Sequence, residues 1–325
     1  GTLLYDGRRD EWSARLCEMI GLDPSVLPPI VAPTATVGEV TAAAAAASGL
    51  AAGTPVVCGS SDTSVETLGA GAAAVGQGAV KLATAAAISI VGREPRPDLS
   101  VINYPFCVPG HWYTIGATNS CASAHRWLRD SFFADDRRSG AEIFDAMDRD
   151  AAGIAPGAQG LLFHPYLQGE RTPHWDPLLR ADFIGLTFAH DRRHLVRALY
   201  EGIALSLRDV LVQLRGRGLE LEEARIIGGG SSSATWRQIV ADVLGVPMLV
   251  PRQTDASYGA ALVAGIGIGV FPDAAAAVAR GVSVVDRHEP NPVHRSLYDD
   301  LYGIYRDAAL RLVDINHRLA GLEGK

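Results

Sequence analysis

The clearest pattern along the chain is a helical repeat of apolar residues in its second half. Between residues 196 and 214, apolar side chains recur every three or four positions, which is the spacing of one face of an α-helix. The pattern predicts one long amphipathic helix, whose buried face carries Val196, Leu199, Ile203, Leu207, Val210 and Leu214.

The last third of the chain alternates strand and helix patterns. Residues 225–227 and 248–250 predict short strands. Helical patterns follow them, and a final amphipathic helix is predicted from about residue 296 to residue 319. Such alternation predicts an α/β layer with mixed sheet pairing.

The first half contains shorter predicted elements. Residues 55–58 are predicted to form a buried strand that ends at Gly59-Ser-Ser-Asp62. Residues 81–90 predict one further strand, and residues 111–115 could be its antiparallel partner. Helices are expected after Ser13, over residues 40–47 and after Asn119, and strands over residues 161–166 and 183–186.

Composition and charge narrow the class of protein. The 325 residues are 48% hydrophobic and 20% charged, enough for one large or two ordinary globular domains. A net charge of −7 argues against a nucleic-acid partner, because phosphate backbones need basic patches. No apolar stretch reaches membrane-spanning length. The four cysteines form no Cys-x-x-Cys pair, which argues against a zinc site and fits a reducing cytoplasm.

Asp62 is the first candidate for chemistry. It follows a predicted strand at a Gly/Ser turn, where α/β folds place reactive groups. The same segment could instead begin a helix, because Asp62 or Thr63 could be the N-cap and Thr63-x-x-Glu66 fits a capping box. The two roles are compatible if Thr63 caps the helix while Asp62 points into a cleft.

Two further segments could bind phosphate or a nucleotide. The hydroxyl of Thr84 and nearby backbone N–H groups could hold a phosphate in a turn between strands. The glycines Gly228, Gly229 and Gly230 separate a predicted strand from a helix, so backbone could approach a flat or charged ligand there. They could equally serve tight strand–helix packing, and the dinucleotide fingerprint Gly-x-Gly-x-x-Gly is absent.

A charged, proline-bounded loop, Gly169-Glu-Arg-Thr-Pro173, offers a third possibility. His164, Glu170, His174 and Asp176 are residue types that bind metals, but their spacing is irregular for a metal site. A structural network of Glu170 and Arg171 is therefore the preferred interpretation. A serine hydrolase is excluded, because no Gly-x-Ser-x-Gly elbow surrounds Ser60.

The order of the motifs carries more information than any one of them. Together they resemble the FGGY carbohydrate kinases over essentially the whole chain, and most of all the xylulose kinases. The segments that carry the resemblance are Gly59-Ser-Ser-Asp62, Leu68-Gly-Ala-Gly71, Ala83-Thr84-Ala85, Arg126-Trp-Leu-Arg129, Pro165-Tyr-Leu-Gln-Gly-Glu-Arg-Thr-Pro173, Phe183-Ile-Gly-Leu186, Ala198-x-Tyr-Glu201, Gly228-Gly-Gly230 and Tyr258-Gly-Ala-Ala261.

The resemblance implies a fold and a division into domains. The fold is the actin-like ATPase fold, an α/β fold of ribonuclease H-like domains with a mixed sheet. Residues 1–79 would be the end of the N-terminal, sugar-binding domain, and residues 80–325 the C-terminal, nucleotide-binding domain. The family's Asp-x-Gly-Thr phosphate loop has no match here, so we expect a truncated or split chain that is inactive alone.

The resemblance also implies the reaction. ATP and Mg²⁺ would serve the phosphorylation of a sugar hydroxyl, most specifically of D-xylulose to D-xylulose 5-phosphate. The enzyme would be cytoplasmic, with a homodimer as one candidate assembly. Gluconate, ribulose or glycerol are alternative acceptors, and a non-catalytic nucleotide- or sugar-binding relative is another reading. Asp62 maps onto the catalytic base, and no residue is assigned as a metal ligand. The nucleotide-binding positions implied are Thr84, Ala122, Arg126, Gly228, Gly229, Gly230 and Ser233.

One departure from the family affects the phosphate loop. Ala83 and Ala85 replace glycines on either side of Thr84. If either position needs a positive φ, alanine costs about 1–2 kcal/mol. A methyl group there could also crowd the γ-phosphate and weaken turnover.

Overall fold

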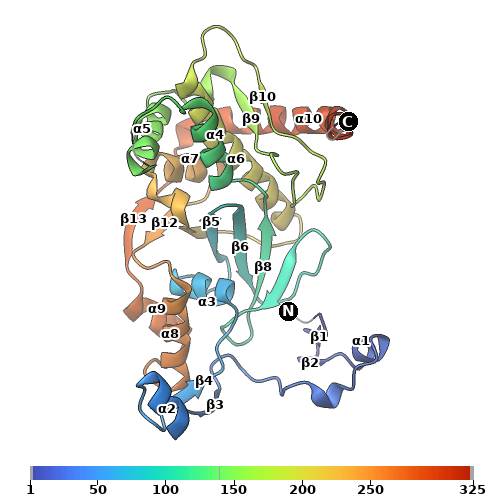
Figure 1. The fold of residues 1–325 in the computed structure, drawn as a ribbon, viewed down its shortest axis with the longest axis vertical. Helices are drawn as coiled ribbons and strands as arrows, with labels where there is room; N and C mark the ends of the chain where they lie inside the picture. Colours follow the sequence, from blue (N-terminus) through green and yellow to red (C-terminus); the bar gives the residue numbers. More distant parts are fainter. Residues whose placement is uncertain (1–2, 139, 323–325) are drawn as a thin grey trace.

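A computed structural model describes residues 3–138 and 140–322. Its centre is a mixed sheet of seven strands (Figure 1). The parallel pairs are β5 with β11 and β11 with β12, and the other neighbours are antiparallel. From edge to edge the order is β13 (Val284–His288), β12 (Met248–Pro251), β11 (Glu223–Ile227), β5 (Gln77–Leu82), β6 (Ala86–Gly92), β8 (Trp112–Ala117) and β7 (Ile102–Pro105).

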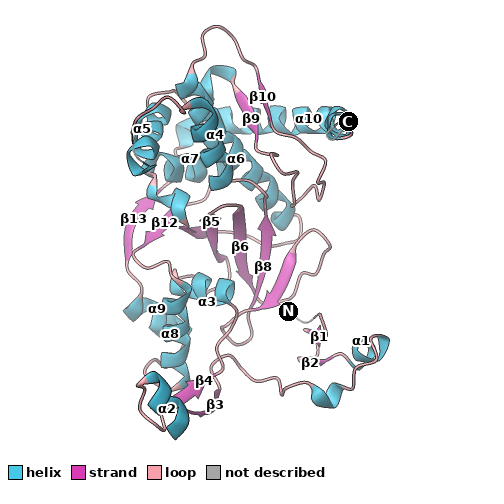
Figure 2. Ribbon diagram, viewed as in Figure 1, coloured by secondary structure: helices cyan, strands magenta, loops and turns pink. Residues whose placement is uncertain are grey.

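Helices cover the sheet on two sides (Figure 2). A separate apolar core fills the space on each side, which gives an α/β/α arrangement of layers. The larger layer contains α4 (Ala122–Phe132), α5 (Gly140–Ala152), α6 (Arg192–Arg215), α7 (Ala234–Leu244) and α10 (Arg295–Ala320). The smaller layer contains α3 (Asp62–Gly69), α8 (Ala256–Gly267) and α9 (Ala274–Gly281).

The long helix predicted from the apolar repeat is α6. All six of its predicted core residues are buried. Every residue from Val196 to Leu207 is buried as well, so this part of α6 is enclosed on all sides and the predicted burial of a single face is wrong. A two-stranded sheet of β9 (Leu162–His164) and β10 (Asp182–Ile184) packs near it. Among the described residues, no helix combines the length and apolar character needed to cross a membrane.

The segment before α3 forms short, exposed elements, drawn in blue in Figure 1. Among the described residues of this segment, Cys17 is the one buried apolar residue. The predicted strand over residues 55–58 exists as β4, but its side chains are exposed or half-buried, so the prediction of a buried strand is wrong. The elements are β1 (Tyr5–Asp6), β2 (Glu11–Trp12), α1 (Ala14–Met19), β3 (Thr36–Glu39), α2 (Ala42–Ser48) and β4 (Pro55–Val57).

Residues 81–90 are not one strand. The chain turns back after Leu82, so this stretch holds the end of β5, a tight hairpin and most of β6. β8 pairs with β6 antiparallel, as predicted. The turn places Thr84 at the end of the sheet. This position fits the alternative in which Thr84 lies in a turn between strands and could hold a phosphate.

Helices α3 and α8 cross at unusually close range. A Cβ atom built on Gly259 would lie 1.8 Å from the carbonyl oxygen of Val65, and one on Gly69 would lie 2.8 Å from the backbone nitrogen of Gly259. Only glycine fits such a contact between backbones. These two glycines therefore set the position of α3, the helix that begins at Asp62.

Replacing Gly259 with alanine is expected to destabilise the protein by about 1–3 kcal/mol, because the added methyl group must displace the backbone of α3. The control is Gly303→Ala in α10, where a Cβ would meet no atom within 4 Å. That change should be neutral or stabilising by about 0.5–1 kcal/mol. Urea unfolding of both variants measures the difference, and equal stabilities would contradict the close crossing.

Candidate functional site

The candidate site lies where two parallel strands end next to each other in the middle of the sheet. β5 and β11 are in register from Gln77 opposite Glu223 to Lys81 opposite Ile227. Thr84 follows β5, and the three glycines follow β11. Open α/β sheets bind ligands at the carboxyl ends of such strands. The structure thus brings together two segments that are distant in sequence.

The three glycines have two different roles. Gly228 has a φ of +87°, and a Cβ there would lie 2.7 Å from the carbonyl oxygen of Leu82. A Cβ at Gly230 would lie 2.9 Å from the Cβ of Leu82 and 3.0 Å from the ring of Trp236. Gly228 and Gly230 therefore allow the glycine loop to pack on the hairpin. A Cβ at Gly229 would meet nothing within 4 Å, so its surface is open to a ligand.

Thr84 occupies the tip of the β5–β6 hairpin with its side chain exposed. Its carbonyl oxygen accepts hydrogen bonds from the backbone nitrogens of Cys121, at 3.0 Å, and Ser123, at 3.2 Å. The Ser123 hydroxyl donates to the same oxygen at 2.8 Å. These bonds hold the hairpin against the N-terminus of α4. Within the described residues the Thr84 hydroxyl has no hydrogen-bond partner, which leaves it available to a ligand.

The alanines around Thr84 fit the hairpin without backbone strain. Neither Ala83 nor Ala85 has a positive φ, so the strain of an alanine at positive φ does not arise. Ala83 also accepts the backbone N–H of Ala122 at 2.8 Å, which is a second tie between the hairpin and α4.

Asp62 is the first residue of α3, and its side chain is exposed. The N-cap is Ser61, so neither Asp62 nor Thr63 caps the helix. The capping box is also wrong, because Glu66 pairs with a lysine instead. One oxygen of Asp62 accepts the backbone N–H of Thr63 at 2.7 Å. A carboxylate at a helix N-terminus is stabilised by the helix dipole, and its other oxygen points away from this bond.

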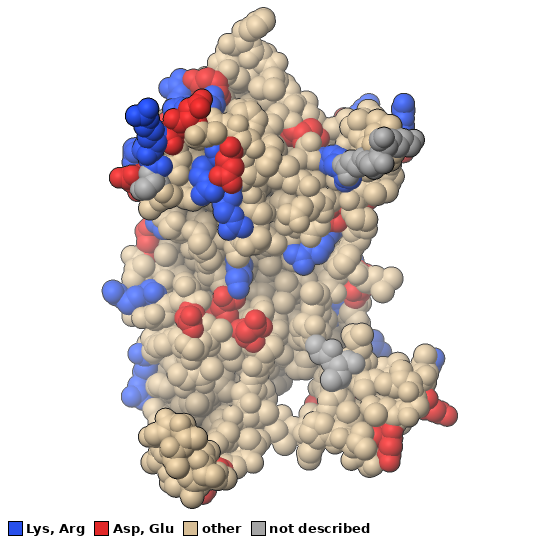
Figure 3. Space-filling model, viewed as in Figure 1, with Lys and Arg blue, Asp and Glu red and all other residues tan. Residues whose placement is uncertain are grey.

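The ion pair of Lys81 with Glu66 ties α3 to the strand that carries Thr84. The Lys81 Nζ atom donates to both carboxylate oxygens, at 2.8 and 2.7 Å. Sequence reasoning missed this pair, although a lysine in the apolar strand pattern could have revealed it. Figure 3 shows a small group of acidic side chains on the visible face over α3, and basic and acidic side chains side by side over α4 and α5.

Ser233 is placed beside the glycine loop, but its hydroxyl already has two partners. It caps α7 by accepting the Trp236 N–H at 2.8 Å, and it donates to the carboxylate of Asp148. Sequence reasoning missed Asp148, which lies in α5, a helix that was not predicted. Arg126 is exposed on α4. The nucleotide-binding roles of these residues and of Ala122 remain predictions.

The loop of residues 168–172 forms a structural network, but one that differs from the expected pair. Glu170 is buried, and one of its oxygens accepts the backbone N–H groups of Asn119 at 2.6 Å and Arg171 at 2.8 Å. The guanidinium of Arg171 turns away and donates to the carbonyl oxygen of Thr118. Glu170 and Arg171 thus form no side-chain ion pair, and each binds backbone instead.

Burial raises the pKa of Glu170 to about 7, while the hydrogen bonds from Arg171 and Asn119 oppose the rise. A raised folded-state pKa contributes stability that is present below the unfolded value and is lost as the pH rises through about 7. Wild type is therefore expected to lose up to about 3 kcal/mol more than Glu170→Gln between pH 4.5 and pH 8. Urea unfolding at both pH values measures this, and parallel pH profiles would contradict it.

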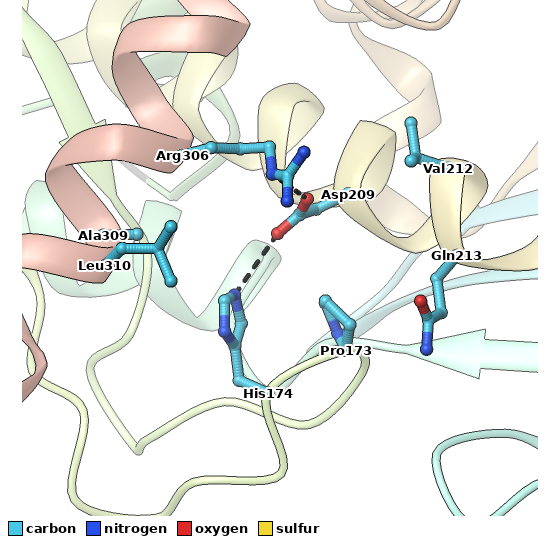
Figure 4. A pocket seen from close by; sticks show the side chains of 8 residues that line it. All are labelled: Pro173, His174, Asp209, Val212, Gln213, Arg306, Ala309 and Leu310. Carbon is cyan, nitrogen blue, oxygen red and sulfur yellow. Dashed lines mark ion pairs between the residues drawn. The ribbon is translucent and has the colours of Figure 1, made fainter. Parts of the chain in front are cut away.

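A hollow of 230 Å³ lies elsewhere, between α6, α10 and the loop after Thr172 (Figure 4). His174 and Arg306 reach the Asp209 carboxylate from opposite sides, with nitrogen–oxygen distances of 3.3 and 3.6 Å. Asp209 also accepts the Tyr302 hydroxyl at 2.6 Å. None of the predicted site residues lines this hollow.

Comparisons with known proteins agree on one family. Residues 64–268 match the C-terminal domain of the FGGY family of carbohydrate kinases, and residues 1–69 match the N-terminal domain of the same family. A xylulose kinase of Staphylococcus epidermidis is 32% identical over 94% of this chain and 60% of its own length. A gluconokinase of Bacillus licheniformis is 31% identical over 90% of the chain and 58% of its own length.

A solved structure shows the same arrangement. The xylulose kinase from Rhodospirillum rubrum matches with a TM-score of 0.87 and 30% identity, over 97% of this chain and 63% of its own. The chain thus spans about three fifths of the length of the curated relatives it matches. The shared part includes the sheet and both layers of helices.

Proposed function

This chain belongs to the FGGY family of carbohydrate kinases, and we propose that it carries the catalytic carboxylate and the nucleotide site of a kinase that phosphorylates a sugar hydroxyl. Its mixed sheet and its likeness to the solved kinases confirm the predicted actin-like ATPase fold. The chain spans about three fifths of the length of its relatives. The proposed activity is therefore assigned to the whole protein that contains this chain.

One observation supports the nucleotide site above the others. The Thr84 hairpin and the glycine loop touch at the ends of parallel strands, with Gly228 packed against Leu82. Backbone N–H groups in such turns are suited to phosphate, and the open surface at Gly229 is suited to a flat base. In this proposal the phosphates lie at Thr84 and the adenosine lies over the glycine loop.

Asp62 is the proposed base. The sugar oxygen attacks the γ-phosphorus in line, the bond from that phosphorus to the ADP oxygen breaks, and Asp62 accepts the hydroxyl proton. A carboxylate is too weak a base to deprotonate an alcohol beforehand, but the transition state is loose and late proton acceptance suffices. The exposed position of Asp62 at the start of α3 fits a group that receives this proton.

A Mg²⁺ ion held mainly by the nucleotide is part of the proposal. Within residues 3–138 and 140–322, no three His, Cys, Asp or Glu side chains cluster as a metal site. Mg²⁺ often keeps several water ligands and binds substrate phosphates with one or two carboxylates. When bound, the ion would neutralise charge on the transferring phosphoryl group.

D-Xylulose is the proposed acceptor, since xylulose kinases stand among the most similar relatives. The similar gluconokinase makes gluconate the second candidate. A coupled assay of ADP release, with D-xylulose, D-gluconate, D-ribulose and glycerol, distinguishes them in a protein that contains this chain. Turnover with D-xylulose above the rest supports the proposal, and a preference for another acceptor reassigns the substrate. Nucleotide binding without turnover on any sugar would favour a non-catalytic relative.

A further inference from the structure

The loop of residues 168–172, here named the bracing loop, packs on the segment that holds the Thr84 hairpin. That segment, residues 117–123, connects β8 to α4 and is named the connector. Neither the bracing loop nor its glutamate has a part in the proposed phosphoryl transfer. Hydrogen bonds nevertheless join the bracing loop to the connector, and the connector to the Thr84 hairpin.

On one side, the bracing loop binds the connector backbone. Glu170 accepts the Asn119 N–H at 2.6 Å, and Arg171 donates from its Nε atom to the Thr118 carbonyl oxygen at 3.1 Å. The backbone N–H of Thr172 donates to the carbonyl oxygen of Ala117 at 3.0 Å, and the backbone N–H of Ala117 donates to the Thr172 hydroxyl oxygen at 3.3 Å. Three consecutive connector residues are thus fixed by three consecutive loop residues.

On the other side, the connector binds the hairpin. The hydroxyl of Thr118 accepts the Ala86 N–H at 3.1 Å, and the Thr118 N–H donates to the Ala86 carbonyl oxygen at 2.8 Å. Cys121 and Ser123 both donate to the carbonyl oxygen of Thr84. A shift of the connector would therefore change the shape of the turn that presents Thr84.

Glu170 is the least replaceable member of this chain of contacts. Its side chain is buried, and a single carboxylate oxygen accepts the N–H groups of both Asn119 and Arg171. Its second oxygen lies 3.4 Å from the Ser206 hydroxyl of α6, which ties the loop to the rigid helix below. A buried N–H group without an acceptor is costly, so removing this oxygen should release the Asn119 backbone.

We propose that Glu170 is a positioning residue for phosphate binding, which fixes the connector through Asn119 and thereby holds the Thr84 hairpin in its binding shape. The inference rests on the proposed nucleotide site. It predicts an effect on the phosphate end of the nucleotide and none on the adenosine end. The glycine loop follows β11, and within the described residues no hydrogen bond joins it to the bracing loop.

The test compares two replacements of similar length. Glu170→Gln keeps an oxygen that can accept both N–H groups, whereas Glu170→Met removes the acceptor without leaving a large cavity. Binding of AMP-PNP with Mg²⁺ and binding of AMP are measured by calorimetry on the 325-residue chain. We expect Glu170→Met to weaken AMP-PNP binding about tenfold and to leave AMP binding unchanged, while Glu170→Gln matches wild type for both.

The control is Tyr302→Phe, which removes the buried bond to Asp209 at the hollow of Figure 4. It should lower thermal stability without changing the ratio of the two affinities. If Glu170→Met does not fold, Glu170→Asp replaces it, because its shorter carboxylate withdraws from Asn119. The same selective loss is then expected.

The outcomes separate this inference from the proposed function. If wild type binds neither ligand, the nucleotide site itself is wrong and the inference falls with it. If wild type binds AMP-PNP and the Met or Asp variant binds it equally well, only the positioning role is wrong. Equal losses for AMP-PNP and AMP would show a general structural role, and a loss in Glu170→Gln would show that the charge matters rather than the acceptor. Both results would overturn the inference.

Discussion

Replacing Asp62 with asparagine is expected to lower kcat for sugar phosphorylation by about 10²–10⁴-fold. Asparagine has the same shape and can still lie at the start of α3, but it cannot accept the proton that leaves the sugar hydroxyl. The affinity for nucleotide should stay within about twofold of wild type, since within the described residues the Asp62 side chain hydrogen-bonds only to Thr63.

The measurement is steady-state turnover in a protein that contains this chain and phosphorylates a sugar, together with nucleotide binding to the same variant. Asp300→Asn is the matched control, because Asp300 is an exposed aspartate in α10. It should leave kcat unchanged. Retained turnover in Asp62→Asn would remove Asp62 from the mechanism.

Replacing Gly228 with alanine is expected to abolish nucleotide binding and to destabilise the fold by about 2–5 kcal/mol. Two costs add: the positive φ of Gly228, about 1–2 kcal/mol for alanine, and the overlap of its Cβ with the Leu82 backbone, about 1–3 kcal/mol. Relief of the overlap must move the glycine loop away from the hairpin, which separates the two halves of the proposed site.

Gly229→Ala distinguishes packing from ligand contact. Its Cβ would meet no protein atom within 4 Å, so stability should change by less than about 0.5 kcal/mol. If adenosine lies over Gly229, the methyl group should nevertheless weaken nucleotide binding. Unchanged binding in Gly229→Ala would place the base elsewhere, and unchanged binding in Gly228→Ala would contradict the need for contact between loop and hairpin.

The sequence predicted those elements whose pattern is local. The repeat from Val196 to Leu214 became α6, because a spacing of three or four residues between apolar side chains is a local signal of a helix. The burial of its other faces depends on packing that this spacing does not show. The turn at Thr84 was only an alternative to one continuous strand, because alanines and β-branched residues run through residues 81–90 without the Gly or Asn that usually marks a tight turn. Helix α5 was missed, although Ile143, Ala146 and Met147 have helical spacing.

The site was predictable only in part, for a physical reason. Asp62, Thr84 and the glycines could be named from motif order, but the meeting of Thr84 with the glycines depends on β11 pairing with β5, a contact between distant segments. Likewise, no local sequence pattern shows that the Leu82 backbone leaves no room for a side chain at Gly228, or that Glu170 binds the Asn119 backbone. Whether Asp62 begins a helix or caps it depended on a single residue, and Ser61 proved to be the cap.

The most direct test of the central claim is a crystal structure of this chain with Mg²⁺ and AMP-PNP. The account predicts phosphate oxygens within hydrogen-bonding distance of the Thr84 hydroxyl and hairpin backbone, and adenosine over Gly229. A nucleotide bound in the hollow beside Asp209, or one whose phosphates avoid the Thr84 hairpin, would contradict it.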